Sequence, residues 1–171
     1  GVRVHGLAKE GDHFIASTEK GDLKADVVVW ATGQFFSPRD QAFPGAELAL
    51  HSSKVNDWNE LKGDEFTVIG GYESGLDAAL NLVDLGKSVS LHSRGEPWSS
   101  DDPDPSRSIS PRTFDRLREI LQSSEKSKKL ELFKNSDVHR IEESQGWWTL
   151  FDQDEIPSVS HTRPIRANGF H

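Results

Sequence analysis

Hydrophobic and polar positions follow their clearest pattern between residues 65 and 93. Residues 66–69 form a compact apolar run, typical of a short buried strand, and a glycine turn follows at once. After the turn, apolar residues recur at i, i+3, i+4 and i+7, which predicts one face of an amphipathic helix: Leu76, Ala79, Leu80 and Val83. Gly86 is placed to end that helix, and residues 87–93 predict a second strand. A strand, a helix and a strand within about thirty residues predict a βαβ unit with parallel strands and a right-handed connection.

Further strand and helix patterns lie on either side of this unit. Short strands separated by turn residues are expected at 2–7, 13–18 and 23–30, and the apolar run 27–30 predicts a strand buried on both faces. A polar, Pro-rich loop over 96–111 leads to a helix that starts near Pro111 and has one apolar face, made of Phe114, Leu117, Ile120 and Leu121. Later strands are expected at 129–133, 138–144, 146–152 and 163–170. The sequence therefore predicts an α/β fold, a Rossmann-like βαβ domain with a parallel central sheet plus a β-meander.

Composition excludes several classes of protein. The 171 residues include 28 Asp and Glu against 20 Lys and Arg, for a formal net charge of −8, which argues against a nucleic-acid partner. No window approaches the roughly 18 apolar residues that span a bilayer, so we expect no membrane insertion and a cytoplasmic protein. Cysteine is absent, which excludes disulfides, thiolate metal sites and a redox Cys pair within these residues. Methionine is absent too, and we expect the chain to be a piece of a larger protein.

The glycine turn, residues 70–75 with the sequence GGYESG, resembles the G-x-G-x-x-G turn that binds dinucleotides. Gly70 takes the first glycine position and Gly75 the third, while Tyr72 replaces the second and Gly71 lies between them. Backbone amides at the start of the following helix, from Tyr72 to Ser74, would face the pyrophosphate. Tyr72 fits only if its φ is negative and its ring points outward. A carboxylate beside phosphates would repel them, so Glu73 must point away or accept a hydrogen bond from elsewhere.

The end of the second strand gives a clue to cofactor choice. NAD-binding folds place Asp or Glu about twenty residues beyond the turn, whereas NADP-binding folds carry an Arg there. This chain has His92, Ser93 and Arg94 at that point, so we expect Ser93 and Arg94 to hold the 2′-phosphate of NADP(H). An ordinary surface arginine is the alternative, and Glu96 keeps NAD possible.

The chain resembles flavin-dependent oxidoreductases with two dinucleotide domains, the group of flavin-containing monooxygenases and thioredoxin-reductase-like enzymes. The segments that carry the likeness are VVVWATGQFFSPRDQAFPG, HSSKVNDW, VIGGYESGLDAALNL with VSLHSR, and RPIRANGF. The likeness is strongest to a bacterial branch named for monooxygenases or for flavoproteins in potassium transport, where a GGxESGxDAA turn is familiar.

This resemblance implies a division of the chain and a role for each part. Residues 1–36 would be a meander and strand leading out of an FAD domain, 37–64 a linker, 65–160 the NADP(H)-binding domain, and 161–171 the return strand. The exit would bring Ala31, Thr32 and Gly33 near the cofactors, whereas the return has Asn168 in place of the usual Thr. The parent would pass hydride from NADPH to FAD and act on a small-molecule substrate, and this piece alone, without the missing FAD-binding domain as its partner, is expected to be inactive.

The sequence lacks the patterns of a metal site. Seven histidines are spread without the spacing of a metal-ligand motif, and the acidic stretch 101–104 lacks the spacing of a calcium loop, so no metal site is predicted. The alternative function is a non-catalytic nucleotide-sensing module that regulates a transporter or a partner protein.

Overall fold

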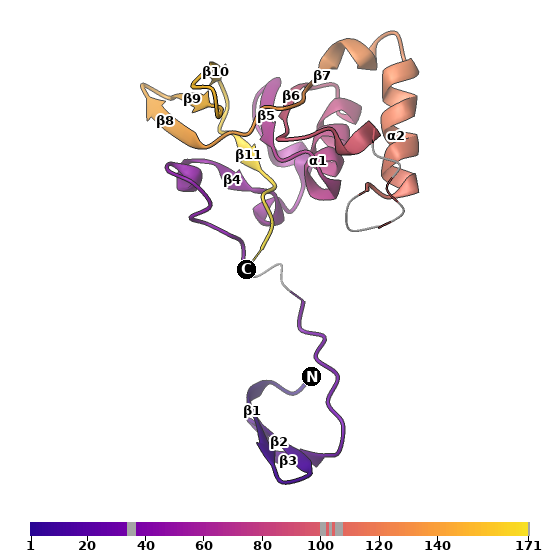
Figure 1. Cartoon of the computed structure of the whole chain (residues 1–171), viewed down its shortest axis with the longest axis vertical. Helices are drawn as coiled ribbons and strands as arrows, with labels where there is room; N and C mark the ends of the chain where they lie inside the picture. The colour runs from indigo at the N-terminus through magenta and orange to yellow at the C-terminus, as the bar shows by residue number, and fades with distance from the viewer. Residues whose placement is uncertain (34–36, 100–101, 103, 105–107, 171) are drawn as a thin grey trace. The chain divides into compact units, whose positions relative to one another are not determined.

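The computed structural model describes residues 1–33, 37–99, 102, 104 and 108–170 (Figure 1). The chain divides into two compact units, residues 1–33 and 34–171. The polar loop expected at 96–111 and the acidic stretch within it lie partly outside the described residues.

The first unit is a three-stranded antiparallel meander in the order β1-β2-β3. Its strands are β1 (Val4–Glu10), β2 (His13–Thr18) and β3 (Gly21–Ala25). The prediction of a buried strand at residues 27–30 is wrong, because Val27, Val29 and Trp30 are 78%, 83% and 74% exposed and lie outside the strands. The physical reason is that no described strand pairs with these residues, so neither face is covered.

The second unit is built on a five-stranded sheet in the order β4-β11-β5-β6-β7, and every neighbouring pair is parallel. Its strands are β4 (Leu50–His51), β11 (Ile165–Arg166), β5 (Glu65–Ile69), β6 (Ser88–His92) and β7 (Leu130–Phe133). The parallel α/β fold expected from the sequence is thus confirmed. β4 was not predicted, because two residues are too few to carry a pattern.

Helix α1 (Glu73–Asp84) forms the predicted crossover between β5 and β6. All four apolar positions of its predicted face are buried, since each is at most 1% exposed. The helix ends at Gly86, which has φ of +80° and donates its amide to Val83, while Lys87 donates to Leu82. These two bonds are the hydrogen bonds of a Schellman motif, so the predicted stop is confirmed with its mechanism.

Helix α2 (Pro111–Gln122) covers the same face of the sheet as α1. Ser110 is its N-cap and Pro111 its first residue. The buried stripe consists of Thr113, Leu117 and Ile120. The predicted apolar face is therefore only half right, because Phe114 and Leu121 are 36% and 48% exposed at the edge of that stripe.

The opposite face of the sheet is covered by a second antiparallel meander, order β10-β9-β8 (Figure 1). Its strands are β8 (Arg140–Ser144), β9 (Trp147–Phe151) and β10 (Pro157–Ser160). Side chains alternate between the two faces of a strand, so Val68 joins the core under the helices while Ile69 joins a second core with Ile141 and Leu150.

Short 3-10 helices connect these elements: η1 (Ala46–Leu48), η2 (Ser52–Lys54), η3 (Trp58–Glu60), η4 (Pro97–Ser99) and η5 (Lys126–Lys129). Among the described helices, none combines the length and the apolar character that crossing a membrane requires.

Candidate functional site

The carboxyl ends of the parallel strands form the edge where the candidate site lies. From β5 the chain crosses through α1 to β6 on one side, whereas β11 joins β5 on the other side. In open α/β sheets, ligands bind at such a switch in strand order. Here a cleft of about 550 Å³ opens between the loop after β5 and the loop after β11, residues 167–169.

The glycine turn is packed so tightly that side chains have no room at three positions. A Cβ on Gly75 would lie 1.6 Å from the Gly70 carbonyl oxygen, and one on Gly70 would lie 2.7 Å from the Ala167 carbonyl oxygen. A Cβ on Gly71 would lie 2.3 Å from the Ser93 hydroxyl oxygen. Gly70 also has φ of +108°, which L side chains rarely adopt. The glycines therefore bring the start of α1 close to both β5 and the loop after β11.

Tyr72 stands at the N-cap of α1 with φ of −83° and ψ of −168°. This is extended backbone that any residue adopts, and the side chain is 43% exposed. Its carbonyl accepts the amides of Gly75 and Leu76 at 3.0 and 2.9 Å. Within the described part of the chain, the amides of Tyr72, Glu73 and Ser74 have no backbone acceptor. The mouth of α1 thus presents, beside the cleft, amides that no described backbone carbonyl accepts, and such amides favour an anion.

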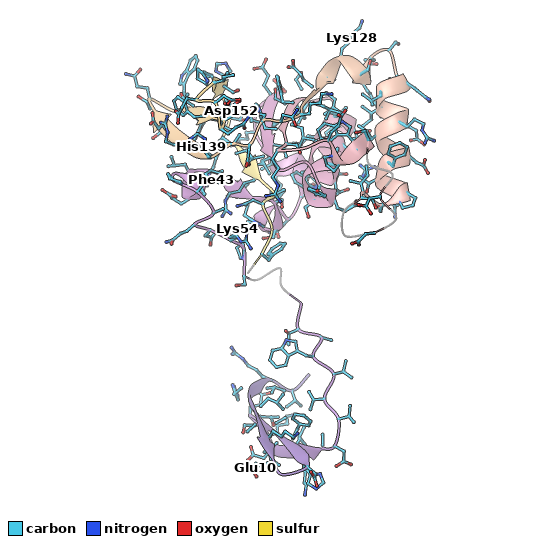
Figure 2. All side chains as sticks on the ribbon, in the orientation of Figure 1. Glu10, Phe43, Lys54, Lys128, His139 and Asp152 are labelled. Atoms are coloured by element: carbon cyan, nitrogen blue, oxygen red, sulfur yellow. The ribbon has the colours of Figure 1, made fainter. Side chains whose placement is uncertain are left out.

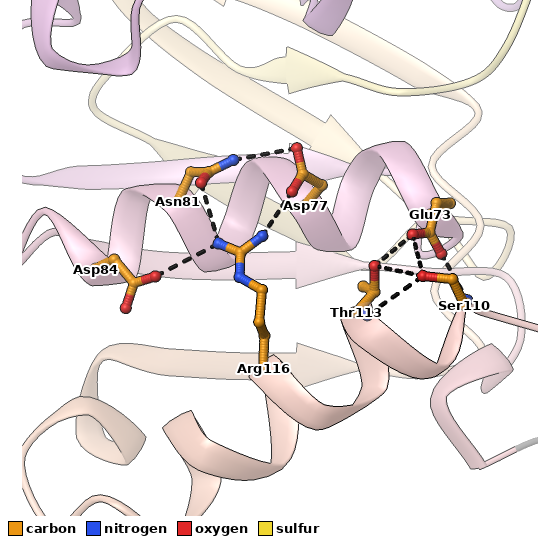
Figure 3. Close-up of polar contacts among 7 residues, drawn as sticks. All are labelled: Glu73, Asp77, Asn81, Asp84, Ser110, Thr113 and Arg116. Carbon is orange, nitrogen blue, oxygen red and sulfur yellow. Dashed lines mark hydrogen bonds and ion pairs between the residues drawn. The ribbon is translucent and has the colours of Figure 1, made fainter.

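The Glu73 carboxylate does not compete with an anion for those amides. It accepts the Ser110 amide at 2.9 Å and the Ser110 hydroxyl at 2.8 Å, and it also accepts the Thr113 hydroxyl (Figure 3). Burial raises the pKa of this carboxyl, but the hydrogen bonds from Thr113 and Ser110 outweigh burial and hold the pKa below its ordinary value. Its negative charge therefore lies against the N-terminus of α2.

The end of β6 places three predicted residues at the cleft in different ways. His92 is 3% exposed, stacks on Phe133 at 4.7 Å between ring centroids and bonds Ser136 through Nδ1 at 2.9 Å. Burial lowers the pKa of His92 below its ordinary value, although the charge of Asp152 opposes this shift. Ser93 is 2% exposed, and its hydroxyl accepts the Gly95 amide at 3.4 Å. Arg94 lines the cleft with an exposed side chain and has no ion pair with any residue that the structure describes.

Ala31, Thr32 and Gly33 belong to the first unit, where they are exposed and lie outside its strands. Gly33 has φ of +73°, in keeping with a turn. The structure thus brings together the predicted residues of the glycine turn and of the end of β6, all in the second unit.

The loop after β7 and the loop after β11 also line the cleft, together with Phe43 from the segment before η1, and of these only Asn168 was singled out from the sequence. Phe43 and His139, both labelled in Figure 2, lie along it, as does Asn168. Nδ1 of His139 and Nδ2 of Asn168 are buried without a hydrogen-bond partner among the described residues. The signal for these loops was available, because each follows a parallel strand and so ends at the same edge of the sheet.

Arg166 is the largest buried polar side chain at this edge, at 1% exposure. Its guanidinium donates to the Arg39 carbonyl oxygen at 2.7 Å, to Asn168 Oδ1 at 3.1 Å and to the Asp40 carboxylate. Burial raises the pKa of Asp40, but the hydrogen bond from Arg166 and the charge of Lys54 outweigh burial. The pKa of Asp40 is therefore below its ordinary value. Arg166 thereby joins the first residues of the second unit, at Arg39 and Asp40, to its last strand, β11.

The residues at this edge fit a dinucleotide. The three glycines leave a backbone cradle that a Cβ would fill, and the amides at the mouth of α1 have no backbone acceptor among the described residues. A family model described as pyridine nucleotide-disulphide oxidoreductase matches residues 1–171. The chain belongs to the pyridine nucleotide-disulphide oxidoreductase family.

Curated relatives of this family member include reductases and a monooxygenase. The ferredoxin–NADP reductase of Thermus thermophilus is 29% identical over 99 residues, which cover 53% of this chain and 29% of that protein. The trimethylamine monooxygenase of Methylocella silvestris is 34% identical over 84 residues, which cover 46% of this chain and 19% of that protein. The chain therefore matches less than a third of the length of either relative.

Solved structures support the fold. The bacillithiol disulfide reductase Bdr of Staphylococcus aureus matches with a TM-score of 0.69 and 21% identity, covering 99% of this chain and 49% of that one. The L-lysine 6-monooxygenase of Pseudomonas syringae matches with a TM-score of 0.66 and 17% identity, over 99% of this chain and 52% of that one. The fold of the pyridine nucleotide-disulphide oxidoreductase family is thus shared with a reductase and a monooxygenase alike.

Proposed function

We propose that the second unit is the NADP(H)-binding domain of an FAD-dependent oxidoreductase. The observation that carries the proposal is the glycine cradle at the switch in strand order, with three amides at the mouth of α1 that lack a backbone acceptor in the described chain. The amides of Tyr72, Glu73 and Ser74 would hold the pyrophosphate. NADPH, when bound, supplies the hydride, and the chain's own groups orient the cofactor.

Arg94 rather than Ser93 is the group we assign to the 2′-phosphate. Arg94 is exposed at the cleft, whereas the Ser93 hydroxyl is buried between Gly71 and the Gly95 amide. Ser93 therefore holds the turn and the Arg94 segment together, and the charged contact falls to the guanidinium.

Titration calorimetry with NADPH and NADH tests this assignment. We expect Arg94→Ala to weaken NADPH binding by about 1.5–3 kcal/mol, the contribution of a charge-assisted hydrogen bond, and to leave NADH nearly unchanged. Arg112→Ala is the matched control, because Arg112 is exposed on α2 and does not line the cleft. Equal losses for both cofactors would remove Arg94 from the 2′-phosphate site, and no saturable binding of either cofactor to the unsubstituted chain would refute the proposed function.

The parent protein would complete the flavin site. Val27, Val29 and Trp30 are each more than 70% exposed, which suits a strand that pairs with the rest of an FAD-binding domain. Because the chain has no cysteine, a thiol pair for disulfide chemistry would have to come from elsewhere in the parent. The likeness to the trimethylamine monooxygenase of Methylocella silvestris supports monooxygenase-like chemistry on a small-molecule substrate, with FAD as the hydride acceptor.

The parent's colour separates this proposal from a nucleotide-sensing module. A full-length parent that is yellow and loses its colour with NADPH supports the flavin enzyme. A colourless parent that still binds NADPH would instead favour the sensor. No feature of the described structure favours the sensor or the potassium-transport role.

A further inference from the structure

Helix α2 has an N-terminal cap that is completed from outside the helix. Ser110 caps it, since the hydroxyl accepts the Thr113 amide at 3.3 Å. In a capping box, a Glu or Gln at the third helical position reaches back to the amide of the N-cap residue. That position in α2 is occupied by Thr113, whose side chain is a hydroxyl. The Ser110 amide is instead accepted by Glu73, the first residue of α1, at 2.9 Å.

Glu73 also lies within the glycine turn, residues 70–75. It follows Tyr72 directly, and its own amide is one of the three without a backbone acceptor in the described chain. The carboxylate makes contacts to Ser110 and Thr113 on α2 while the backbone forms the mouth of α1 (Figure 3). One residue therefore links the cap of one helix to the anion-binding end of the other.

The same turn is held at two further points by the chain that leads to α2. A Cβ on Gly71 would meet Ser93 Oγ at 2.3 Å and the Trp98 ring at 3.0 Å. Ser93 and Trp98 thus lie against the turn on the β6 side. On the α2 side, Ser110 donates hydrogen bonds to Glu73 of the turn. Of these three contacts with the turn, the one between Ser110 and Glu73 consists of hydrogen bonds, and it depends on a single carboxylate.

We propose that Glu73 is a positioning residue for dinucleotide binding: its carboxylate completes the α2 cap and thereby fixes the mouth of α1 in the conformation that receives the phosphates. The inference rests on the proposed function. Glu73 also turns its charge toward the N-terminus of α2, where the helix dipole favours it, and away from the cleft. A carboxylate that merely stood near the phosphates would weaken binding, so removing it would tighten binding. A positioning carboxylate predicts the opposite sign.

Three variants separate positioning from simple capping. Glu73→Ala removes the link. Glu73→Ala combined with Thr113→Glu supplies a capping-box glutamate within α2, so the cap and the local charge return while the link to α1 does not. Arg116→Met is the matched control, because Arg116 joins α2 to Asp77 and Asn81 further along α1 and leaves the Glu73 contact intact.

Each variant is measured for thermal stability, for hydrogen exchange of the amides in residues 71–76 without ligand, and for NADPH affinity by calorimetry. We expect Glu73→Ala to lower Tm, to speed exchange in the turn and to raise the Kd for NADPH about tenfold, the lower end of what hydrogen bonds to a charged group contribute. The double variant should keep the fast exchange and the weak binding, and its Tm reports how well a carboxylate is accepted at the largely buried Thr113 position. Arg116→Met should lower Tm without changing either.

Full recovery of exchange and affinity in the double variant would reduce Glu73 to a helix cap and overturn the proposal, as would tighter NADPH binding by Glu73→Ala. If Glu73→Ala does not fold, Glu73→Gln replaces it, since the amide keeps one acceptor oxygen and should give a smaller change of the same sign. Absence of NADPH binding to the unsubstituted chain would refute the proposed function, whereas exchange in the ligand-free turn still decides the role of Glu73.

Discussion

Gly75→Ala tests whether α1 begins as close to β5 as the backbone allows. Gly75 is buried in the first turn of α1, and a Cβ there would lie 1.6 Å from the carbonyl oxygen of Gly70. Real Cβ atoms essentially never come closer than 3.0 Å to such an atom. The obstacle is backbone, which cannot rotate aside as a side chain does. The helix must therefore move away from the strand, and the amides at its mouth must move with it.

Two opposing terms set the size of the effect. Alanine gains about 1 kcal/mol of helix propensity over glycine, whereas forcing a methyl group into a packed site costs about 1–3 kcal/mol and more where backbone must shift. Because the clash is with backbone at this short distance, we expect a net loss of about 2 kcal/mol or more in the free energy of unfolding, measured by urea denaturation.

Gly95→Ala is the matched control for this substitution. A Cβ on Gly95 meets nothing within 4 Å, and its φ is outside the left-handed region, so its unfolding free energy should stay within about 0.5 kcal/mol of the unsubstituted chain. NADPH binding should be lost in Gly75→Ala and kept in Gly95→Ala. If the two variants unfold at the same urea concentration, the close approach of α1 to β5 is refuted.

Two further predictions concern the buried stripe of α2 and the dependence of stability on pH. Leu117→Ala should cost about 2–5 kcal/mol in urea unfolding because Leu117 is 2% exposed, whereas Leu121→Ala, at a 48% exposed position, should cost less than about 1 kcal/mol; equal losses would contradict the buried stripe. Hydrogen bonds from Thr113 and Ser110 overcome burial and lower the pKa of Glu73 from its ordinary value of 4.5, so the stability it provides is complete above pH 4.5 and is lost as the pH falls through the folded-state pKa. The difference in unfolding free energy between the unsubstituted chain and Glu73→Gln should therefore shrink below pH 4.5, and a constant difference would show that the carboxylate gains nothing from being ionised there.

Local patterns predicted the βαβ unit because its contacts are local. The apolar stripe of α1 and the stop at Gly86 are read from neighbours a few residues apart, and both formed as expected. Residues 27–30 have the same apolar character as a central strand. Strand pairing also needs a partner strand, and the local sequence pattern does not show whether one is present. Strand order likewise depends on long-range pairing, and the two-residue strand β4 finds its place only beside β11.

The candidate site shows the same limit. The glycine turn and Arg94 follow a spacing rule and were found from the sequence. The buried Arg166 and its partner Asp40 are 126 residues apart, and nothing local pairs them. Glu73 was recognised as a carboxylate that needed a partner, but only the structure names Ser110 and Thr113, 37 and 40 residues away. The missing glutamate at the third position of α2 leaves the amide of the N-cap residue open to water or to a partner from elsewhere, and the sequence does not say which.

Tyr72 shows why a motif should be read as a set of backbone demands. The first glycine position requires a left-handed φ, and the third requires that no Cβ stand between helix and strand; Gly70 and Gly75 meet these demands. The second position requires only an accessible amide. With φ of −83° and a side chain 43% exposed, Tyr72 leaves its amide without a backbone acceptor among the described residues, as glycine would. Substitution at that position is therefore tolerated for a physical reason, while substitution at the other two is not.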